Sequence, residues 1–197
     1  GERNVLLIFL EGIPGVYLSQ VQEATGVEAP ITMSHFSRIA EQGRAVANAV
    51  VHNRQTIRGL YSAFTGDYPR FDLSPPKIYP YMQADVQQRP PALPRQLADM
   101  GFYTAFLQGA DLSYMSKDRF MPAVGFARTS GSEYFDYQHV DFEWGPDDKA
   151  FFEQAASYID QIDKKQQRWF VSLLTVGTHH PYGVSDEYAK EYPNRKL

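Results

Sequence analysis

The stretch "NVLLIFLE", residues 4–11, gives the clearest indication of the fold class. Its near-continuous apolar run from Asn4 to Leu10 is typical of a β-strand that is buried on both faces. Such strands belong to parallel sheets, in which helices cover both faces. The turn "GIPG" follows, so this strand ends on the carboxylate of Glu11.

Strand and helix patterns alternate along the rest of the chain. Further strands are predicted for "RAVANAVV", "FYTAFLQ" and "RWFVSLLTV", residues 44–51, 102–108 and 168–176. Helices are predicted for residues 33–42, 56–65, 93–101 and 116–124, and for a segment that begins at Asp147 or Asp148. This alternation predicts an α/β fold, with a mostly parallel sheet flanked by helices on both faces.

The composition sets limits on organisation and function. The 197 residues suit one domain, residues 1–197, in which the Pro- and Tyr-rich stretch 66–94 forms a long loop. The net charge of −4 argues against a nucleic-acid partner. The absence of cysteine excludes disulfides, cysteine nucleophiles and thiolate metal sites. No apolar run approaches the roughly 20 residues of a membrane-spanning helix.

Polar residues collect where the predicted strands end. Because ligands of open α/β sheets bind at the carboxyl ends of the strands, we expect these residues to share one edge. They are Glu11 after the first strand, His52 to Thr56 after the second, Gln108, Gly109 and Asp111 after the third, and Thr178, His179 and His180 after the fourth.

Thr56 has two interpretations. It is either the N-cap of the helix that follows, or a nucleophile that a metal or a base must activate. Glu11 would supply an oxygen ligand to a divalent cation if it faces the Thr56 hydroxyl. The free N–H groups at a helix start suit a phosphate or sulfate, whose charge Arg54 and Arg58 would stabilise unless they are surface residues.

The histidine pair also has two interpretations. His179 and His180 precede Pro181 and therefore lie in a turn, where adjacent side chains point in different directions. At most one of them is expected in the site, and a pair on the surface is the alternative. The sequence contains no "GxSxG" motif, no Walker loop and no dinucleotide glycine fingerprint.

Taken in order, five segments resemble the alkaline phosphatase/sulfatase superfamily, and within it the lipoteichoic acid synthases and periplasmic phosphoglycerol transferases. They are "NVLLIFLEG", "QTIRGLYSAFTGDYP", "GFYTAFLQGADLSYMSKDRFMPAVGF", "EWGPDDKAFFEQA" and "WFVSLLTVGTHHPY". The resemblance covers nearly the whole chain. It implies that Glu11 is a metal ligand and that Thr56 is both nucleophile and metal ligand, with one divalent ion, Mn²⁺, Mg²⁺ or Zn²⁺.

The segment around Thr56 also looks like the sulfatase signature. Sulfatases, however, carry a Cys or Ser there, which is oxidised to formylglycine, and a Pro two residues later. Thr56 is followed by Ile57 and Arg58, so this processing cannot occur. The resemblance therefore favours transfer of a phosphoryl group over hydrolysis of a sulfate ester.

The substrate-binding positions match less closely. The family histidine before the "HHPY"-type turn corresponds to His179, and we place His180 beside it in the substrate site. Gln108 stands where the family has a histidine, and Met115 and Lys117 stand where it has a Trp and Arg pair. Lys117 keeps the positive charge but not the two-pronged fork of arginine.

The resemblance implies that a phosphoglycerol-type headgroup passes from a phospholipid donor to Thr56, and then to a hydroxyl of a glycan or polyol-phosphate acceptor. His179 would act as acid or base or bind the headgroup, while Arg54, Arg58 and Lys117 would stabilise the phosphoryl oxygens. The alternatives are a phosphodiesterase- or sulfatase-type hydrolase and a non-catalytic binding domain.

One family motif is absent. An Asp-His pair in an "SDHG"-like motif completes the family's metal site, and "SDEY" at residues 185–188 lacks the histidine. We therefore expect the fold to be incomplete at its C-terminus, with the C-terminal remainder of the protein or another chain as a partner. The resemblance also implies a location outside the cytoplasmic membrane, periplasmic or extracellular, held by an anchor outside this chain.

Overall fold

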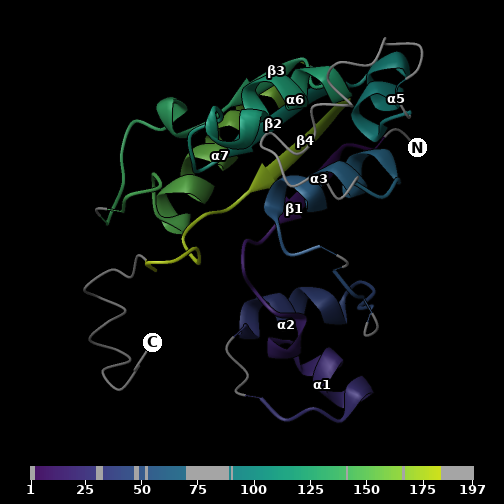
Figure 1. Ribbon diagram of the computed structural model, residues 1–197, viewed down its shortest axis with the longest axis vertical. Coiled ribbons are helices and arrows are strands. Elements are labelled where there is room, and N and C mark those ends of the chain that lie inside the picture. The colour runs from purple at the N-terminus through teal and green to yellow at the C-terminus, as the bar shows by residue number, and fades with distance from the viewer. Residues whose placement is uncertain are drawn as a thin grey trace. The chain divides into compact units, whose positions relative to one another are not determined.

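The computed structural model describes residues 3–29, 33–46, 49–51, 53–69, 89, 91–140, 142–165 and 167–182. The chain divides into two compact units, one of residues 1–11 and 53–197 and the other of residues 12–52. The larger unit contains the regular elements of the sheet (Figure 1). In chain order they are β1 (Val5–Phe9), α3 (Thr56–Thr65), α5 (Leu93–Asp99), β2 (Tyr103–Gln108), the short helix η3 (Tyr114–Ser116), α6 (Lys117–Val124), β3 (Arg128–Ser130), η4 (Ser132–Tyr134), α7 (Asp148–Asp163) and β4 (Trp169–Leu174).

The sheet of the larger unit is parallel throughout. Its strand order is β1-β4-β2-β3. In this register Leu174 at the end of β4 lies opposite Phe9 on one side and Gln108 on the other. Three strands therefore end at the same level, and the residues that follow them emerge at one edge of the sheet.

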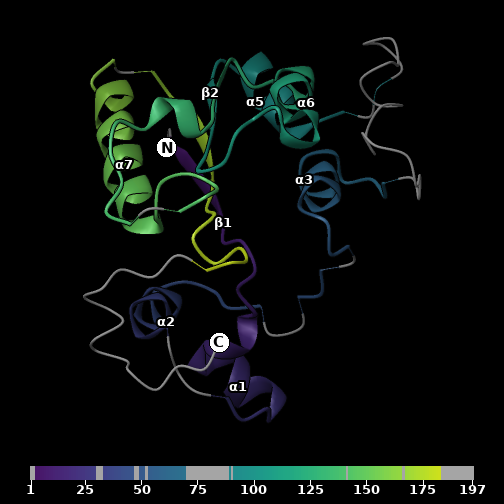
Figure 2. The ribbon, with the colours of Figure 1, turned by 60° about the vertical axis from the view of Figure 1, so that its left-hand side comes forward.

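Helices cover both faces of the sheet, as Figure 2 shows with α7 on one side and α3, α5 and α6 on the other. Successive strand residues point to opposite faces. Phe106 and Phe170 accordingly pack with the apolar side chains of α3 and α6, whereas Leu107 and Val171 pack with those of α7. The predicted fold class, a parallel α/β sheet between two helical layers, is confirmed.

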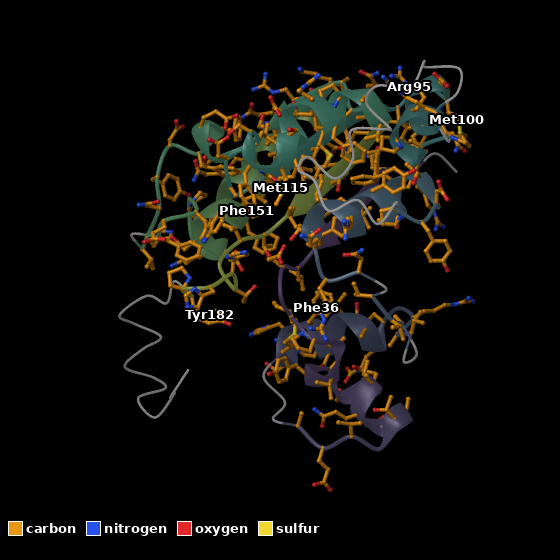
Figure 3. All side chains as sticks on the ribbon, in the orientation of Figure 1. Phe36, Arg95, Met100, Met115, Phe151 and Tyr182 are labelled. Atoms are coloured by element: carbon orange, nitrogen blue, oxygen red, sulfur yellow. The ribbon has the colours of Figure 1, made fainter. Side chains whose placement is uncertain are left out.

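Helix α7 follows its sequence signals closely. The Asp147 side chain caps it by accepting a hydrogen bond from Ala150 N at 3.1 Å. Its buried residues fall on one face at helical spacing, and Figure 3 places Phe151 among the packed side chains of the larger unit. The capping signal and the apolar spacing together set where this helix begins and which face it buries.

The smaller unit contains the short helix η1 (Gly15–Tyr17), α1 (Ser19–Thr25) and α2 (Ser34–Glu41). Helix α2 lies within the predicted range 33–42, whereas α1 was not predicted. No apolar side chain among the described residues of this unit is buried, and Ile39 on α2 is 65% exposed. This unit therefore has no hydrophobic core of its own in the part that is described.

The prediction of a strand over residues 44–51 is wrong for the six of these residues that the structure describes. Residues 44–46 and 49–51 form no strand, and Val50 and Val51 are 85% and 80% exposed. Alanine and valine suit a strand, but β-propensity mainly reports packing against neighbouring strands, and a single sequence does not show whether a neighbour exists. Residues 47, 48 and 52 lie outside the described part.

Smaller differences concern short elements. β3 was not predicted, because three residues of mixed polarity carry no periodic signal. Most of the predicted loop 66–94, namely residues 70–88 and 90, lies outside the described residues, and α5 begins at Leu93. Among the helices that are described, none has the length and the apolar character needed to cross a membrane.

Candidate functional site

A cavity of about 230 Å³ lies at the carboxyl edge of the sheet, within the larger unit. Such a volume holds several water molecules, so the cavity has room for a small polar group. Six of the residues singled out from the sequence line it: Glu11, Arg54, Thr56, Gln108, Lys117 and His179. They come from the ends of β1, β2 and β4, the start of α3 and the start of α6.

Glu11 is held by its backbone. Its N–H donates to Thr175 Oγ1 at 3.1 Å, and its carbonyl accepts from Thr178 Oγ1. Both threonines follow β4, the strand that pairs with β1. The segment after β4 thus fixes the main chain of Glu11 and leaves its carboxylate available at the cavity.

The Thr56 hydroxyl does not cap α3. The residue at the cap position is Gln55, which makes no side-chain capping hydrogen bond, and Thr56 is the first helical residue. Its Oγ1 instead donates to Glu11 Oε2 at 2.9 Å, although the two residues are 45 positions apart. The structure therefore joins the two groups that the resemblance assigns to one metal ion.

The start of α3 also offers free amide groups. In the described part of the chain, no hydrogen bond from Thr56 N or Ile57 N is present, whereas Arg58 N and Gly59 N both donate to Gln55 O at 3.0 Å. Unpaired N–H groups at a helix start, together with the helix dipole, attract anions. An anion beside Thr56 would meet these two amides.

Lys117 is a buried cation at the cavity. Its side chain is only 4% exposed, and its Nζ donates to Tyr114 O at 3.1 Å. Burial lowers the pKa of Lys117 to about 8, while the charges of Glu11 and Asp111 act in the opposite direction. An ammonium that is short of solvation is well prepared to bind a phosphoryl oxygen.

The backbone turns sharply just before Lys117. Met115 and Ser116 have positive φ values of 58° and 56°, which non-glycine residues adopt at an energetic cost. This turn joins η3 to α6, and Met115, which is labelled in Figure 3, is among the residues that line the cavity. Strain of this kind persists where the surrounding structure imposes it, and here it lies at the residues that lead into Lys117.

Gln108 is fully buried at the end of β2. Its Nε2 donates to Ala110 O at 2.8 Å and to Asp111 O at 2.9 Å, so the orientation of the amide is fixed. Its Oε1 is buried and has no hydrogen-bond partner in the described part of the chain. Gln108 therefore keeps a buried acceptor without a partner in the wall of a cavity that also contains the Glu11 carboxylate.

Trp144 is a cavity residue that the sequence reasoning missed. Its ring lies 4.4 Å from the ring of His179 and 5.4 Å from that of Tyr114, and its Nε1 donates to His180 O at 3.0 Å. The available signal was its position just before the "GPDD" turn, in a chain with two tryptophans. His180 is exposed, and it takes part through its carbonyl oxygen.

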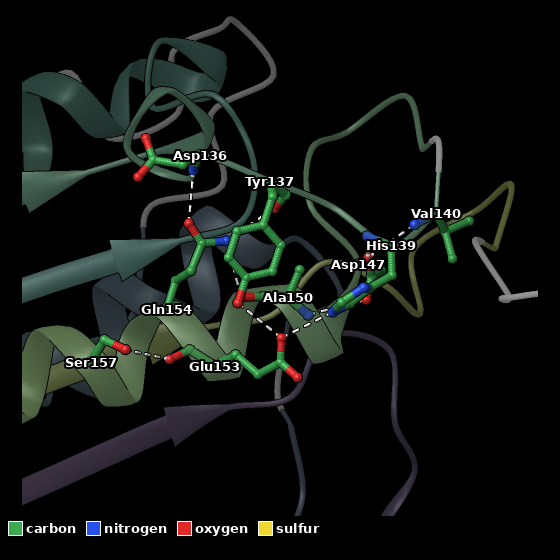
Figure 4. Close-up of polar contacts among 9 residues, drawn as sticks. All are labelled: Asp136, Tyr137, His139, Val140, Asp147, Ala150, Glu153, Gln154 and Ser157. Carbon is green, nitrogen blue, oxygen red and sulfur yellow. Dashed lines mark hydrogen bonds and ion pairs between the residues drawn. The ribbon is translucent and has the colours of Figure 1, made fainter.

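The loop that carries Trp144 is closed by Asp147, as Figure 4 shows. The Asp147 Oδ2 atom accepts from His139 N at 2.6 Å and from Val140 N at 3.1 Å. Burial would raise the pKa of Asp147, but the N–H groups of Ala150, His139 and Val140 outweigh it and lower that pKa. One ionised carboxylate thus caps α7 and ties down the return of the loop.

Gly145 and Asp148 connect this loop to the sheet. Gly145 has a φ of 141°, and a Cβ atom on it would lie 2.0 Å from Gly109 O, so only glycine fits after Trp144. Asp148 Oδ1 accepts from Gly177 N at 2.8 Å and Val176 N at 3.3 Å. Burial raises the pKa of Asp148 against the effect of these two bonds. The "GPDD" turn therefore contacts the ends of both β2 and β4.

Of the two arginines that were predicted to bind the phosphoryl group, Arg54 and Arg58, one lines the cavity and the other does not. Arg54 is exposed and lines the cavity. Arg58 is 9% exposed and belongs to the buried side of α3, and it is not among the described residues that line the cavity. A helix turns by about 100° per residue, so Thr56 and Arg58, two positions apart, point in different directions. The structure therefore does not bring Arg58 to the cavity with Thr56.

Glu11 and Thr56 fit part of a metal site. A carboxylate and a hydroxyl oxygen are hard ligands that suit Mg²⁺ and Mn²⁺ and are tolerated by Zn²⁺. In the described residues, no cluster of three or more His, Asp or Glu side chains could hold a metal ion. The described residues would therefore supply two of the ligands of such a site.

The chain has relatives among known proteins. The Sulfatase family model matches residues 3–197. Phosphoglycerol transferase I of Escherichia coli strain 55989 / EAEC is 33% identical over 91 residues, which are 44% of this chain and 12% of the relative. The protein of the same name from Shigella boydii serotype 18 matches to the same extent. The matched region is thus a small part of these relatives.

Solved structures share the fold. A protein of the alkaline phosphatase superfamily from Vibrio parahaemolyticus aligns with a TM-score of 0.77 at 14% identity. The lipoteichoic acid synthase LtaP from Listeria monocytogenes aligns with a TM-score of 0.73 at 20% identity. Each alignment covers 94% of this chain and 43% of the other chain. At these identities the likeness establishes the fold.

Proposed function

This chain belongs to the sulfatase family, and from that premise we propose that it transfers a phosphoglycerol-type headgroup from a phospholipid to an acceptor hydroxyl, through a phospho-threonine at Thr56. The observation that carries the proposal is the Thr56–Glu11 hydrogen bond of 2.9 Å, inside a cavity that also contains Lys117. The names of the relatives, phosphoglycerol transferase I and lipoteichoic acid synthase, point to the same chemistry.

The first step forms a bond between Thr56 Oγ1 and the phosphorus and breaks the bond from phosphorus to the diacylglycerol oxygen. Glu11 Oε2 is placed to accept the hydroxyl proton of Thr56. Diacylglycerol leaves as the alcohol when its oxygen takes up the proton that Glu11 accepted. A divalent cation held by Glu11 and Thr56, Mn²⁺, Mg²⁺ or Zn²⁺, would lower the pKa of the hydroxyl.

The charge that develops on the phosphoryl oxygens is met by donors of the chain. The Lys117 ammonium and the N–H groups of Thr56 and Ile57 provide this stabilisation, with Arg54 at the exposed side. Gln108 Oε1 can only accept, so it cannot bind an anionic oxygen. It would instead accept from a hydroxyl of the headgroup, which favours a polyol headgroup over phosphocholine, since esterified choline has no N–H or O–H donor.

The second step reverses the first with a different alcohol. The acceptor hydroxyl, on a glycan or a polyol phosphate, loses its proton to His179 and forms a bond to phosphorus. The bond from phosphorus to Thr56 Oγ1 breaks and Thr56 is regenerated. This chemistry on phospholipids suits the outer face of the cytoplasmic membrane, with an anchor and the remaining metal ligands in other parts of the protein.

Intact-mass spectrometry of the complete protein tests the proposal. The protein is incubated with Mn²⁺ and a phosphatidylglycerol donor, beside Thr56→Ala and Thr56→Ser variants. We expect the mass of one phosphoglycerol on Thr56, no adduct in Thr56→Ala, and a slower adduct in Thr56→Ser. Release of free glycerol phosphate at equal rates with and without an added alcohol would indicate a hydrolase. A protein that binds neither Mn²⁺ nor the donor would be a non-catalytic member of the family.

A further inference from the structure

Two N–H donors share one carbonyl oxygen at the turn after β4. His180 O accepts from Trp144 Nε1 at 3.0 Å and lies 2.9 Å from His179 Nδ1. A carbonyl oxygen carries no proton, so both nitrogens in these contacts must be donors. His179 therefore carries a proton on Nδ1, and in the neutral ring Nε2 has the free lone pair.

Trp144 also fixes the plane of the His179 ring. The two ring centroids are 4.4 Å apart with an interplanar angle of 58°, and the Tyr114 ring packs edge-on with the same indole. The same tryptophan thus sets both the carbonyl that Nδ1 contacts and the orientation of the imidazole. His179 lines the cavity, and in the described part of the chain its Nε2 makes no hydrogen bond.

The loop that carries Trp144 is held against both neighbouring strands. Asp147 closes the loop at His139 and Val140 (Figure 4), and Gly145 allows its main chain to approach Gly109. Asp148 holds Gly177 in the segment that leads to His179. Because both ends of the Trp144–His180 hydrogen bond are anchored, the indole position does not depend on that bond alone.

From these contacts we infer that Trp144 is a positioning residue that holds His179 in the Nδ1–H tautomer and leaves Nε2 as the base in the cavity. The tautomer follows from the hydrogen bonds alone. The use of Nε2 rests on the proposed function: the acceptor hydroxyl gives its proton to Nε2, its oxygen bonds to phosphorus, and the bond to Thr56 Oγ1 breaks. Nδ1–H stays bonded to His180 O throughout.

Nuclear magnetic resonance of the histidine nitrogens tests the tautomer directly. The protein is labelled with ¹⁵N-histidine, and the His179 signals are assigned by their loss in a His179→Gln variant. At a pH where the ring is neutral, we expect one-bond coupling of the ring proton to Nδ1 and the shift of an unprotonated nitrogen at Nε2. A proton on Nε2 in the neutral wild-type ring would overturn the inference.

The role of Trp144 is tested with a matched pair of variants. Trp144→Phe keeps an aromatic ring beside His179 and removes the indole N–H. Trp169→Phe removes the other indole N–H of the chain, which donates to Asp163 Oδ1 at 2.9 Å and does not line the cavity. We expect Trp144→Phe to increase the Nε2–H fraction of His179, and Trp169→Phe to leave it at the wild-type value. Equal fractions in both variants would show that Trp144 does not set the tautomer.

Kinetics separate this inference from the proposed function. In Trp144→Phe we expect the transfer to the acceptor to slow by about threefold to tenfold, the effect of one neutral hydrogen bond, while formation of the Thr56 adduct keeps its rate. An Nδ1–H tautomer in a protein that forms no adduct would leave the tautomer standing and refute the proposed function. An Nε2–H tautomer in a protein that does form the adduct would refute only the inference.

Discussion

Thr56 Oγ1 donates a hydrogen bond of 2.9 Å to Glu11 Oε2, across 45 residues of sequence. The contact joins Thr56, the first residue of α3, to Glu11, which is separated from the end of β1 by Leu10 alone. The Thr56 hydroxyl does not cap α3, because Gln55 occupies the cap position. The Glu11 main chain makes its own hydrogen bonds, which leave the carboxylate available to accept from Thr56. This pair is the part of the site from which the predictions start.

The first prediction concerns the metal. Glu11→Gln keeps the shape of the side chain but removes its negative charge, so we expect Mn²⁺ affinity to fall. Losing a residue that merely supports a ligand costs about 10- to 100-fold, and losing a ligand should cost at least as much. Isothermal titration calorimetry of the complete protein measures this, with Glu23→Gln on α1 as the control. Unchanged affinity in Glu11→Gln would remove Glu11 from the metal site.

The second prediction concerns Lys117 and pH. Its pKa of about 8 in the folded state lies below the ordinary lysine value of 10.5, so the unfolded chain binds more protons between these values. Between about pH 8 and pH 10.5, the free energy of unfolding of the wild type should therefore rise with pH relative to that of Lys117→Met. At pH 7 the variant should be more stable by up to about 3 kcal/mol, at about 1.4 kcal/mol for each pKa unit. Urea unfolding of both proteins in EDTA, at pH 7 and pH 10, measures the difference. Parallel pH profiles would mean that Lys117 titrates normally.

The third prediction concerns Gln108 as a selector of headgroups. Gln108→Met has a similar length but neither accepts nor donates. We expect the preference for a hydroxylated headgroup over choline to fall by about tenfold or more, since a site built to bind a hydroxyl rejects analogues that lack it. The measurement is kcat/KM for the two donor lipids. The variant also leaves Ala110 O and Asp111 O without their donor, so we expect a loss of stability of about 1–3 kcal/mol. A variant that is less stable but equally selective would show a purely structural role.

The fourth prediction concerns Asp148. Burial raises its pKa, which means that ionisation is unfavourable in the folded state. Asp148→Asn keeps the oxygen that accepts from Gly177 N and removes the charge, so at pH 7 it should be as stable as the wild type or more stable. The advantage should disappear as the pH falls below the ordinary value of 3.8, where both states of the wild type are protonated.

Asp148→Ala provides the contrast. It leaves the N–H groups of Val176 and Gly177 without an acceptor, and we expect it to lower the free energy of unfolding by about 1–3 kcal/mol. Chemical unfolding of the three proteins measures both effects. If Asn and Ala were equally destabilising, the charge of Asp148 would be what holds the turn.

The fifth prediction concerns Gly145. Alanine at this position meets both a positive φ and the nearby oxygen of Gly109, so the loop must move. We expect Gly145→Ala to lower stability by about 2 kcal/mol or more. It should also alter the fluorescence of Trp144, whereas Gly59→Ala, inside α3 where a Cβ would meet no atom within 4 Å, should leave the fluorescence unchanged and should not lower stability. Retained stability with an unchanged spectrum would contradict the close packing of this loop.

The layers of the fold and three residues of the site could be predicted from the amino-acid sequence. Continuous apolar runs predicted β1, β2 and β4, and a periodic apolar face predicted α7. Strands β2 and β4 are buried as this pattern implies, but the expectation that β1 is buried on both faces is wrong: β1 lies at the edge of the described sheet, and Val5, Leu6 and Ile8 are 39%, 45% and 38% exposed. Parallel strands that end in register bring the residues that follow them to one edge, so Glu11, Gln108 and His179 could be placed together without coordinates. Thr56 was singled out at the predicted helix start as either a cap or a nucleophile, and the resemblance favoured the nucleophile.

The other features of the fold and the site depend on contacts that exist only in the folded protein. Residues 44–46 and 49–51 have strand-like composition but form no strand, because strand formation needs a partner that composition does not reveal. Three features depend on contacts between segments far apart in the chain: the burial of Lys117, the burial of Arg58 outside the cavity lining, and the packing of Trp144 against His179. Such contacts leave no periodic trace in the sequence, so the electrostatics of this site and the tautomer of its histidine are properties of the fold.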